Sequence, residues 1–235
     1  MDILYEGRLQ KNDKPFLIKP LSLDHLEQIL SLQEMVIESL ENKETLQPLS
    51  SEEYHYILKG NGLMIGAFVE GELIAFRALL VPPIDDEEHL GLDIGLSVKE
   101  LTRVIYQEIS NVHPAYRGNR LQKTLAGIIM QQLQQTKCEY NYVCCTVAPF
   151  NIPSLKDKFA QGMEIAALKE KYGDRMRYIF VKELLKNEKI DWTDVATLRM
   201  DDFTGQQTLL SDGFRGFEME NRDGEYWVRY GKKVK

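Results

Sequence analysis

Residues 111–122, NVHPAYRGNRLQ, combine residue types that suit the binding of phosphate groups. They lie between an apolar run and a segment whose apolar residues recur at helical spacing. Pro114 cannot donate a hydrogen bond to a sheet, so we expect the strand that ends at Val112 to part from a neighbour there. Backbone groups freed in this way are available to a ligand.

The residues after Pro114 add both charge and backbone donors. The N–H groups of residues 118–122 fall at the expected N-terminus of a helix, and Arg117, Arg120 and Lys123 lie beside them. Main-chain donors at a helix N-terminus, together with cations, predict a site for a diphosphate. A plain strand-to-helix turn with solvated basic residues is the alternative interpretation.

The composition indicates a globular protein. The chain has 235 residues, of which 43% are hydrophobic and 28% charged, which suits one domain plus an appendage or two small domains. The formal net charge of -7 argues against a nucleic-acid-binding surface.

The cysteines and the N-terminus bear on the compartment. Cys138, Cys144 and Cys145 lack metal-ligand spacing, and adjacent residues of a strand point to opposite faces. We therefore expect reduced, buried thiols and no metal site. The first residues lack a signal-peptide pattern, and no apolar run approaches the ~20 residues that span a bilayer. These features predict a cytoplasmic protein without a membrane partner.

The elements that position the loop follow from periodicity and turn residues. Residues 16–22 are typical of a strand that leads to Ser22, the expected N-cap of an amphipathic helix. Residues 61–83 contain two β-rich runs joined by a Glu-Gly-Glu turn, which predicts an antiparallel hairpin. An acidic connection with weak helical content follows over residues 84–101.

The same reasoning gives the remaining order of elements. We expect a strand over residues 103–112, a helix after the glycine loop, and a strand over residues 140–149. A short helix over residues 151–163 and two closing strands complete a mixed α/β domain of residues 1–185. Residues 186–235 are expected to form a small β-rich extension, with a hairpin at Arg222-Asp223-Gly224.

Two motifs in this order resemble the GNAT family of acyl-CoA-dependent N-acyltransferases over about residues 15–185. They are NVHPAYRGNRLQKTL and, further along the chain, TVAPFNIPSLKDKFAQGM. The resemblance implies a mixed, mostly antiparallel central sheet, flanked by helices and splayed where the cofactor binds. It also implies acetyl-CoA as co-substrate. The family loop has the form Arg/Gln-x-x-Gly-x-Gly/Ala; Arg117 takes its first position, whereas Arg120 and Gln122 replace its small residues.

The resemblance also implies individual site residues. It places Asn151 on the pantetheine arm, although capping the following helix is an alternative role. Lys158 stands where many relatives have the tyrosine that protonates the departing thiolate; a solvated helix lysine is the alternative, with Tyr172 as another acid. The cofactor-binding residues implied are Val112, Arg117, Gly118, Asn119, Arg120, Leu121, Gln122, Lys123 and Asn151.

Acetyl transfer to an amine needs an oxyanion donor and a base. We expect the donor to be the N–H around Val112. A free amine of pKa ~10.4 is protonated at neutral pH, so a base or a water chain must remove its proton before attack. Glu108, on the strand that enters the loop, is the candidate base; an outward-facing strand carboxylate is the alternative.

Other polar and aromatic residues give weaker indications. The acidic residues 85–88 suit attraction of a cationic amine, although such a run is commonly a solvated loop. His113 is expected to be structural. The aromatic residues of the tail are typical of a core or a dimer contact.

The sequence therefore predicts an N-acetyltransferase. It moves an acetyl group from acetyl-CoA to a primary amine of a small molecule or peptide, by direct attack in a ternary complex. No nucleic-acid partner is expected, and a homodimer is compatible with the tail. The alternative is a non-catalytic acyl-CoA-binding sensor or structural relative, which the altered loop and the absent tyrosine favour.

Overall fold

The computed structural model describes residues 3–43, 46–136, 140–185 and 191–234. The chain forms two compact units, Met1–Pro82 with Ile105–Glu139 and Pro83–Val104 with Tyr140–Lys235. The predicted boundary after residue 185 adjoins residues 186–190, which lie outside the described residues, and that division stays a prediction.

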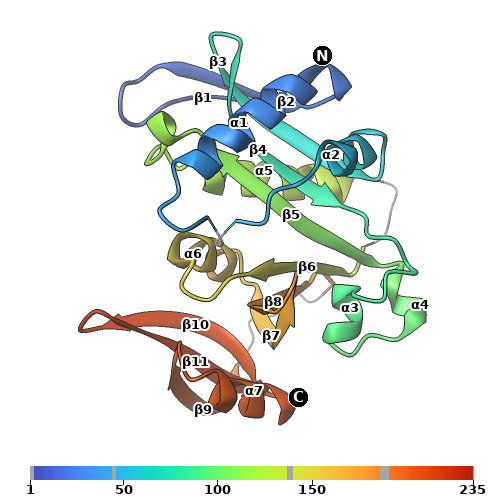
Figure 1. Ribbon diagram of the computed structural model, residues 1–235, viewed down its shortest axis with the longest axis vertical. Helices are drawn as coiled ribbons and strands as arrows, with labels where there is room; N and C mark the ends of the chain where they lie inside the picture. The colour runs from blue at the N-terminus through green and yellow to red at the C-terminus, as the bar shows by residue number, and fades with distance from the viewer. Residues whose placement is uncertain (1–2, 44–45, 137–139, 186–190, 235) are drawn as a thin grey trace. The chain divides into compact units, whose positions relative to one another are not determined.

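The strands of the first unit run antiparallel in the order β1-β2-β3-β4-β5 (Figure 1). They are β1 (Tyr5–Arg8), β2 (Pro15–Pro20), β3 (Gly62–Val69), β4 (Glu72–Leu80) and β5 (Val104–Val112). The predicted hairpin over residues 61–83 is confirmed. Glu70 and Gly71 both have positive φ (52° and 89°), as a two-residue hairpin turn of the favoured hand requires.

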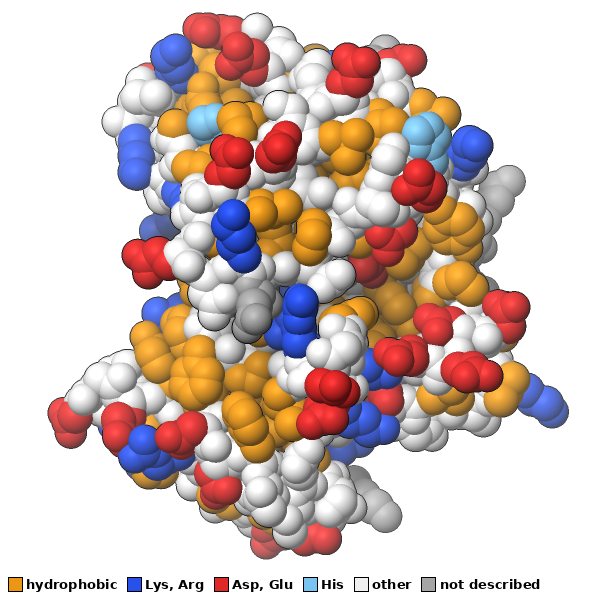
Figure 2. All heavy atoms as spheres, viewed as in Figure 1, with side chains coloured by type: hydrophobic (Ala, Val, Ile, Leu, Met, Phe, Trp, Pro, Cys, Tyr) orange, Lys and Arg blue, Asp and Glu red, His pale blue; other side chains and the backbone are white. Residues whose placement is uncertain are grey.

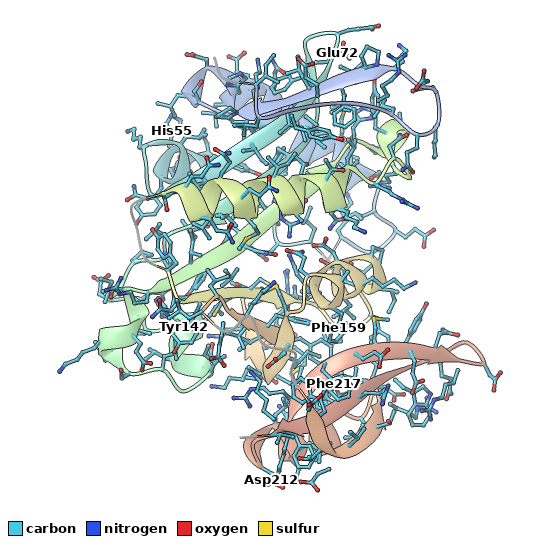
Figure 3. All side chains as sticks on the ribbon, turned by 180° about the vertical axis from the view of Figure 1, so that it is seen from behind. His55, Glu72, Tyr142, Phe159, Asp212 and Phe217 are labelled. Atoms are coloured by element: carbon cyan, nitrogen blue, oxygen red, sulfur yellow. The ribbon has the colours of Figure 1, made fainter. Side chains whose placement is uncertain are left out.

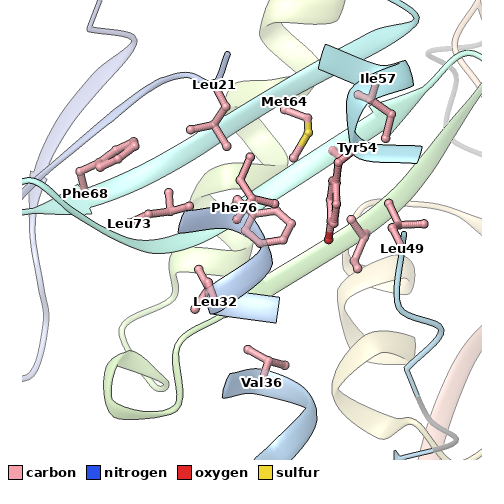
Figure 4. Packing of buried hydrophobic residues seen from close by; sticks show 13 residues of the cluster. Leu21, Leu32, Val36, Leu49, Tyr54, Ile57, Met64, Phe68, Leu73 and Phe76 are labelled. Atoms are coloured by element: carbon pink, nitrogen blue, oxygen red, sulfur yellow. The ribbon is translucent and has the colours of Figure 1, made fainter. Parts of the chain in front are cut away.

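Helices cover both faces of this sheet. α1 (Leu26–Glu38) and α2 (Ser51–Leu58) lie on one face, and α5 (Leu121–Gln135) lies on the other (Figures 1 and 3). Apolar side chains of α1, α2, β3, β4 and β5 form a buried core on the α1/α2 face (Figure 4). There the rings of Tyr54 and Phe76 meet edge to face, with centroids 5.9 Å apart.

Capping residues explain where the first two helices begin. The predicted helix after Ser22 is confirmed, with one short 3-10 turn, η1 (Leu23–His25), before α1. α2 begins after Ser50, whose Oγ accepts from the Glu53 N–H, while the Glu53 carboxylate accepts from the Ser50 N–H. Sequence reasoning missed α2, although this Ser-x-x-Glu pattern was visible.

β5 carries a β-bulge at Glu108, where its register with β4 shifts by one residue. The bulge reverses the alternation of side chains along the strand. Ile109 packs in the core on the α1/α2 face, whereas Gln107 contacts Met130 of α5 on the other face (Nε2 to Sδ, 3.9 Å). The facing of Glu108 therefore could not be obtained from simple alternation.

The strands of the second unit are also antiparallel and follow the order β6-β8-β7-β10-β11-β9. They are β6 (Tyr142–Val147), β7 (Glu164–Lys171), β8 (Arg175–Glu183), β9 (Trp192–Arg199), β10 (Arg215–Arg222) and β11 (Glu225–Lys233). The helices are α3 (Leu90–Asp93), α4 (Val98–Leu101), α6 (Ile152–Ala160) and α7 (Phe203–Ser211). The predicted strand over residues 140–149, the short helix after it and the two closing strands are confirmed as β6, α6, β7 and β8.

The C-terminal strands continue the sheet of the second unit. Gly216 of β10 pairs with Ile165 of β7. The predicted hairpin is confirmed as β10 and β11, joined at Asp223-Gly224. Sequence reasoning missed α7 in this segment, which it expected to be β-rich.

A buried polar network attaches α7 to the strands. The Gln206 Oε1 accepts hydrogen bonds from the hydroxyls of Tyr178 (2.7 Å) and Tyr230 (2.6 Å). Its Nε2 donates to the carbonyls of Arg199 and Met200, both at 3.0 Å. One buried amide side chain thus forms hydrogen bonds to four polar groups, from β8, β11 and the C-terminal end of β9.

Sequence reasoning also led to expectations about cysteines, metal ligands and membrane-spanning helices. Cys144 and Cys145 are buried, and burial raises the pKa of the Cys144 thiol far above its usual range; Cys138 lies outside the described residues. Within the described residues, no three His, Cys, Asp or Glu side chains gather as metal ligands, and no helix has the length and apolarity to cross a membrane. Figure 2 shows Lys and Arg side chains interspersed with Asp and Glu over the face in view.

Candidate cofactor and catalytic site

The loop between β5 and α5 has two residues at positive φ. A 3-10 turn, η3 (Pro114–Tyr116), follows β5, and then Gly118 has φ 81° and Arg120 has φ 58°. Arg120 is the N-cap of α5, and no side-chain hydrogen bond caps this described helix. The N–H groups of the first turn, from Leu121 to Lys123, are therefore free to bind an anion.

Asn119 fixes the shape of this loop. Its side chain is buried; Oδ1 accepts from the N–H of Lys11 (2.9 Å), and Nδ2 donates to the carbonyl of Tyr116 (2.9 Å). The side chain is thus engaged inside the protein, so the backbone N–H is the group through which we expect Asn119 to bind a ligand.

Cations surround the loop, and one of them was missed by sequence reasoning. Arg120 and Lys123 are exposed, and the guanidinium of Arg117 donates to Ser39 Oγ at the end of α1 (2.7 Å). Lys11, in the turn between β1 and β2, lies directly over Gly118: a Cβ at Gly118 would lie 2.8 Å from Lys11 Cε and 3.0 Å from Nζ. Lys11 is far away in sequence, and only the hairpin β1–β2 brings it to the loop.

The N–H of Val112 points away from the neighbouring strand β4. The N–H of the next residue, His113, donates to the carbonyl of Ile74 on β4 (2.9 Å). Successive N–H groups of a strand point to opposite sides, so the Val112 N–H points away from β4. His113 is structural, as expected, since its Nδ1 accepts from the Ala115 N–H (3.1 Å) and caps η3.

Glu108 lies in the bulge, half-buried beside α2. Burial raises the pKa of Glu108 to about 7, and the nearby carboxylate of Glu53 raises it further in the same direction. A carboxyl group with a pKa near neutrality is able to accept and release a proton under physiological conditions. The pKa of Glu108 is therefore suited to a general base, while its role stays a prediction.

Asn151 and Lys158 belong to the second unit, on α6. Asn151 is the N-cap of α6, and its Oδ1 accepts from the Ser154 N–H (3.3 Å), so the capping role is confirmed. Lys158 is not the solvated lysine that the alternative reading expected. It is 6% exposed, and its Nζ lies 3.5 Å from Oδ2 of Asp157, which is also nearly buried.

Tyr172, the other candidate acid, lies at the end of β7 in the same unit. It is exposed, has φ 56°, and its hydroxyl lies 3.3 Å from Thr146 Oγ1 on β6. Thr146 is the second-last residue of β6, just before the loop that leads to Asn151. The structure thus brings a phenol to the C-terminal end of β6, which the sequence did not reveal.

The acidic connection before β5 is partly held by ion pairs. Asp93 binds the ammonium groups of Lys169 and Lys171, both at 2.8 Å, and Lys171 also lies 3.6 Å from Glu88. His89 is buried, and its Nδ1 accepts from the Gly91 N–H (3.0 Å). These contacts fix the connection to β7, while Asp85, Asp86 and Glu87 remain exposed.

Comparison with known proteins gives a consistent picture at the level of structure. No protein-family model matches the sequence, and no curated protein matches it. Among solved structures, the GNAT domain of S. lividans PAT superposes with a TM-score of 0.52, at 16% identity, over 77% of this chain and 96% of that chain. The ribosomal-protein-S18-alanine N-acetyltransferase of Escherichia coli gives a TM-score of 0.54, at 13% identity, over 74% and 97%. The chain has the GNAT fold.

A third structure with this fold contains a ligand. It is yncA, a putative acetyltransferase from Salmonella typhimurium solved with its cofactor acetyl-CoA, with a TM-score of 0.54 and 12% identity, over 75% of this chain and 98% of that chain. The GNAT fold confirms the predicted mixed architecture and its mostly antiparallel sheet. The predicted opening of the sheet at Val112 and the role of each site residue stay predictions.

Proposed function

We propose that this chain is an acyl-CoA-dependent N-acetyltransferase. The observation that carries the proposal is the loop before α5, where Gly118 and Arg120 at positive φ lead into an uncapped helix N-terminus on a GNAT fold. Main-chain N–H groups at such a terminus bind phosphate oxygens, because the helix dipole favours negative charge there. The pyrophosphate of coenzyme A is the anion proposed for this loop.

The side chains around the loop fit that anion. Arg120, Lys123 and Lys11 each place a cation within reach of the loop, on a chain whose net charge is -7. Local positive charge on an acidic protein indicates a specific anion site, since the protein as a whole repels anions. The two replacements of small residues by Arg120 and Gln122 leave the backbone donors in place and add a charge.

The chemistry of transfer uses few side chains. The neutral amine attacks the thioester carbonyl, a C–N bond forms, and the C–S bond then breaks to release the thiolate. The Val112 N–H, which points away from β4, is proposed to stabilise the oxyanion; such a donor typically contributes ~10²–10³ in rate. Glu108 is proposed to take the proton that the ammonium must lose, because its pKa of about 7 makes it a base at neutral pH.

The acid for the thiolate is proposed to be Lys158. Its ammonium is buried and lies 3.5 Å from Oδ2 of Asp157, which places this nitrogen at a defined position. Tyr172 is the alternative donor, and its hydroxyl is held near Thr146. Lys158→Met is expected to lower turnover and to leave coenzyme A affinity nearly unchanged if Lys158 is the donor.

A second function, a non-catalytic acyl-CoA sensor, rests on the absence of a tyrosine at position 158. The two are separated by measuring free thiol release from acetyl-CoA with a panel of primary amines, including polyamines and short peptides. Thiol release that depends on an amine supports the transferase. Binding of coenzyme A without turnover on any amine supports the sensor. The absence of both binding and turnover would contradict both functions.

A further inference from the structure

Asn111 of β5 carries a buried amide that the fold itself does not use. Its side chain is 1% exposed, and within the part of the chain that the structure describes neither Oδ1 nor Nδ2 has a hydrogen-bond partner. Burying an amide in this way destabilises the fold, because both atoms lose their bonds to water. An apolar residue of the same size would carry no such desolvation penalty. The presence of an amide here therefore points to a hydrogen-bonding partner that is not part of the folded chain.

The position of Asn111 suggests that explanation. It pairs across the sheet with Phe76, whose ring packs in the core on the α1/α2 face (Figure 4). Since directly opposite residues of two strands point to the same face, the Asn111 amide lies on that face too. Glu108 lies near Tyr54 and Glu53 of α2, on the same face of the same strand. Val112, the proposed oxyanion donor, is the next residue and is half-buried. A ligand that binds the Val112 N–H therefore lies only one residue along the strand from Asn111.

We propose that the Asn111 side chain binds a secondary amide of a bound substrate. A carboxamide offers both a donor and an acceptor, and a secondary amide is its complement, with one C=O and one N–H. Two sources of this group are compatible with the proposed function, on which the inference rests: the pantetheine arm of coenzyme A and the peptide bond of a peptide acceptor. In either case the ligand would repay the desolvation of the amide.

The test is Asn111→Leu, which removes both polar atoms at nearly constant size. Calorimetric titration uses coenzyme A and 3′,5′-ADP, which has no pantetheine arm. If the pantetheine amide is the partner, Asn111→Leu weakens coenzyme A binding by about tenfold and leaves 3′,5′-ADP binding unchanged. If a peptide acceptor is the partner, both affinities are unchanged, and the KM for peptide amines rises about tenfold while the KM for a polyamine does not.

Ser110→Ala is the matched control, because the Ser110 hydroxyl is also buried without a partner among the described residues but lies next to Arg77 on the α5 face. It should change neither affinity. The melting temperature of Asn111→Leu should rise by about 3 °C, which shows that the variant is folded; Asn111→Ala serves if leucine does not fit. Unchanged coenzyme A affinity and unchanged KM for peptides would overturn the inference and leave the proposed function intact, whereas a wild-type chain that binds no coenzyme A would contradict the proposed function itself.

Discussion

Single backbone conformations determine the shape of the loop before α5. Arg120 has φ 58°, a region in which a side chain with a Cβ costs about 1 kcal/mol. This conformation explains why glycine is the family residue at that position of the motif. The arginine retains the conformation at an energetic cost, and its cation is proposed to compensate for that cost by binding phosphate.

Arg120→Gly is therefore expected to stabilise the protein and to weaken its binding of coenzyme A. The free energy gained by removing the backbone strain exceeds the free energy lost through the greater flexibility of glycine in the unfolded chain by about 0.5 kcal/mol. Urea unfolding measures this, with Arg117→Gly as the control, since Arg117 has φ -60° and should be destabilised by the same substitution. A loss of stability in Arg120→Gly would show that the side chain itself supports the loop.

The second prediction at this scale concerns Glu108 and pH. Its pKa of about 7 lies above the ordinary 4.5, so the folded protein binds this proton more tightly than the unfolded chain. The stabilisation is present in full below pH 4.5 and is lost as pH rises through 7. Glu108→Gln should then be more stable than wild type at pH 8 by about 1–2 kcal/mol, a value discounted for partial exposure, with no difference at pH 4.

Unfolding at the two pH values measures this, and the rate gives an independent check. If Glu108 is the base, Glu108→Gln lowers turnover mainly below the pKa of the acceptor amine, and the loss shrinks as the amine deprotonates unaided. An equal loss at every pH would point to structural damage instead.

At the scale of the element, Gln206 connects α7 to the strands of the second unit. Gln206→Leu leaves two buried phenols and two carbonyls without their partner, so we expect it to destabilise the protein by about 3 kcal/mol. Gln207→Leu, one residue along the same helix and exposed, removes a single hydrogen bond to the Leu168 carbonyl (3.1 Å) and should cost only about 1 kcal/mol. Equal effects of the two substitutions in denaturant unfolding would contradict the assigned network.

The elements also show what the sequence can predict. Strong periodicity and clear turns predicted α1, the hairpin of β3 and β4, β5, α5 and the β10–β11 hairpin. α7 was missed because its apolar residues are few and it contains Gly205; its N-cap, Asp202, was the available signal. The bulge at Glu108 had no sequence signal, because a bulge arises from the register between two strands rather than from local residue types.

The candidate site divides in the same way. The loop residues 117–123 could be found because backbone donors and cations are adjacent in sequence. Lys11 could not, since it reaches Gly118 only through the fold of the N-terminal hairpin. The burial of Lys158 and of Asn111 likewise depends on tertiary packing, which residue types do not reveal.

At the scale of the whole molecule, one close contact joins the C-terminal strands to the sheet of the second unit. A Cβ at Gly216 would lie 3.0 Å from Ile165 Cβ, tighter than most contacts in proteins. Gly216→Val is expected to destabilise the protein by about 1–3 kcal/mol, because β10 and β7 must move apart. Glu218→Val, on the exposed part of β10, should change the free energy of unfolding by less than about 1 kcal/mol. Equal effects in denaturant unfolding would show that this strand contact contributes little to stability.

Calorimetric titration of coenzyme A tests most directly the claim that coenzyme A binds at the loop before α5. Wild type should bind, and Gly118→Ala should bind about tenfold more weakly, because a Cβ at φ 81° strains the loop and displaces Lys11. Gly71→Ala is the matched control, since Gly71 has a similar φ of 89° with open space around it in the β3–β4 turn, and it should bind as wild type does. No heat of binding in the wild type, or equal weakening in both variants, would contradict the claim.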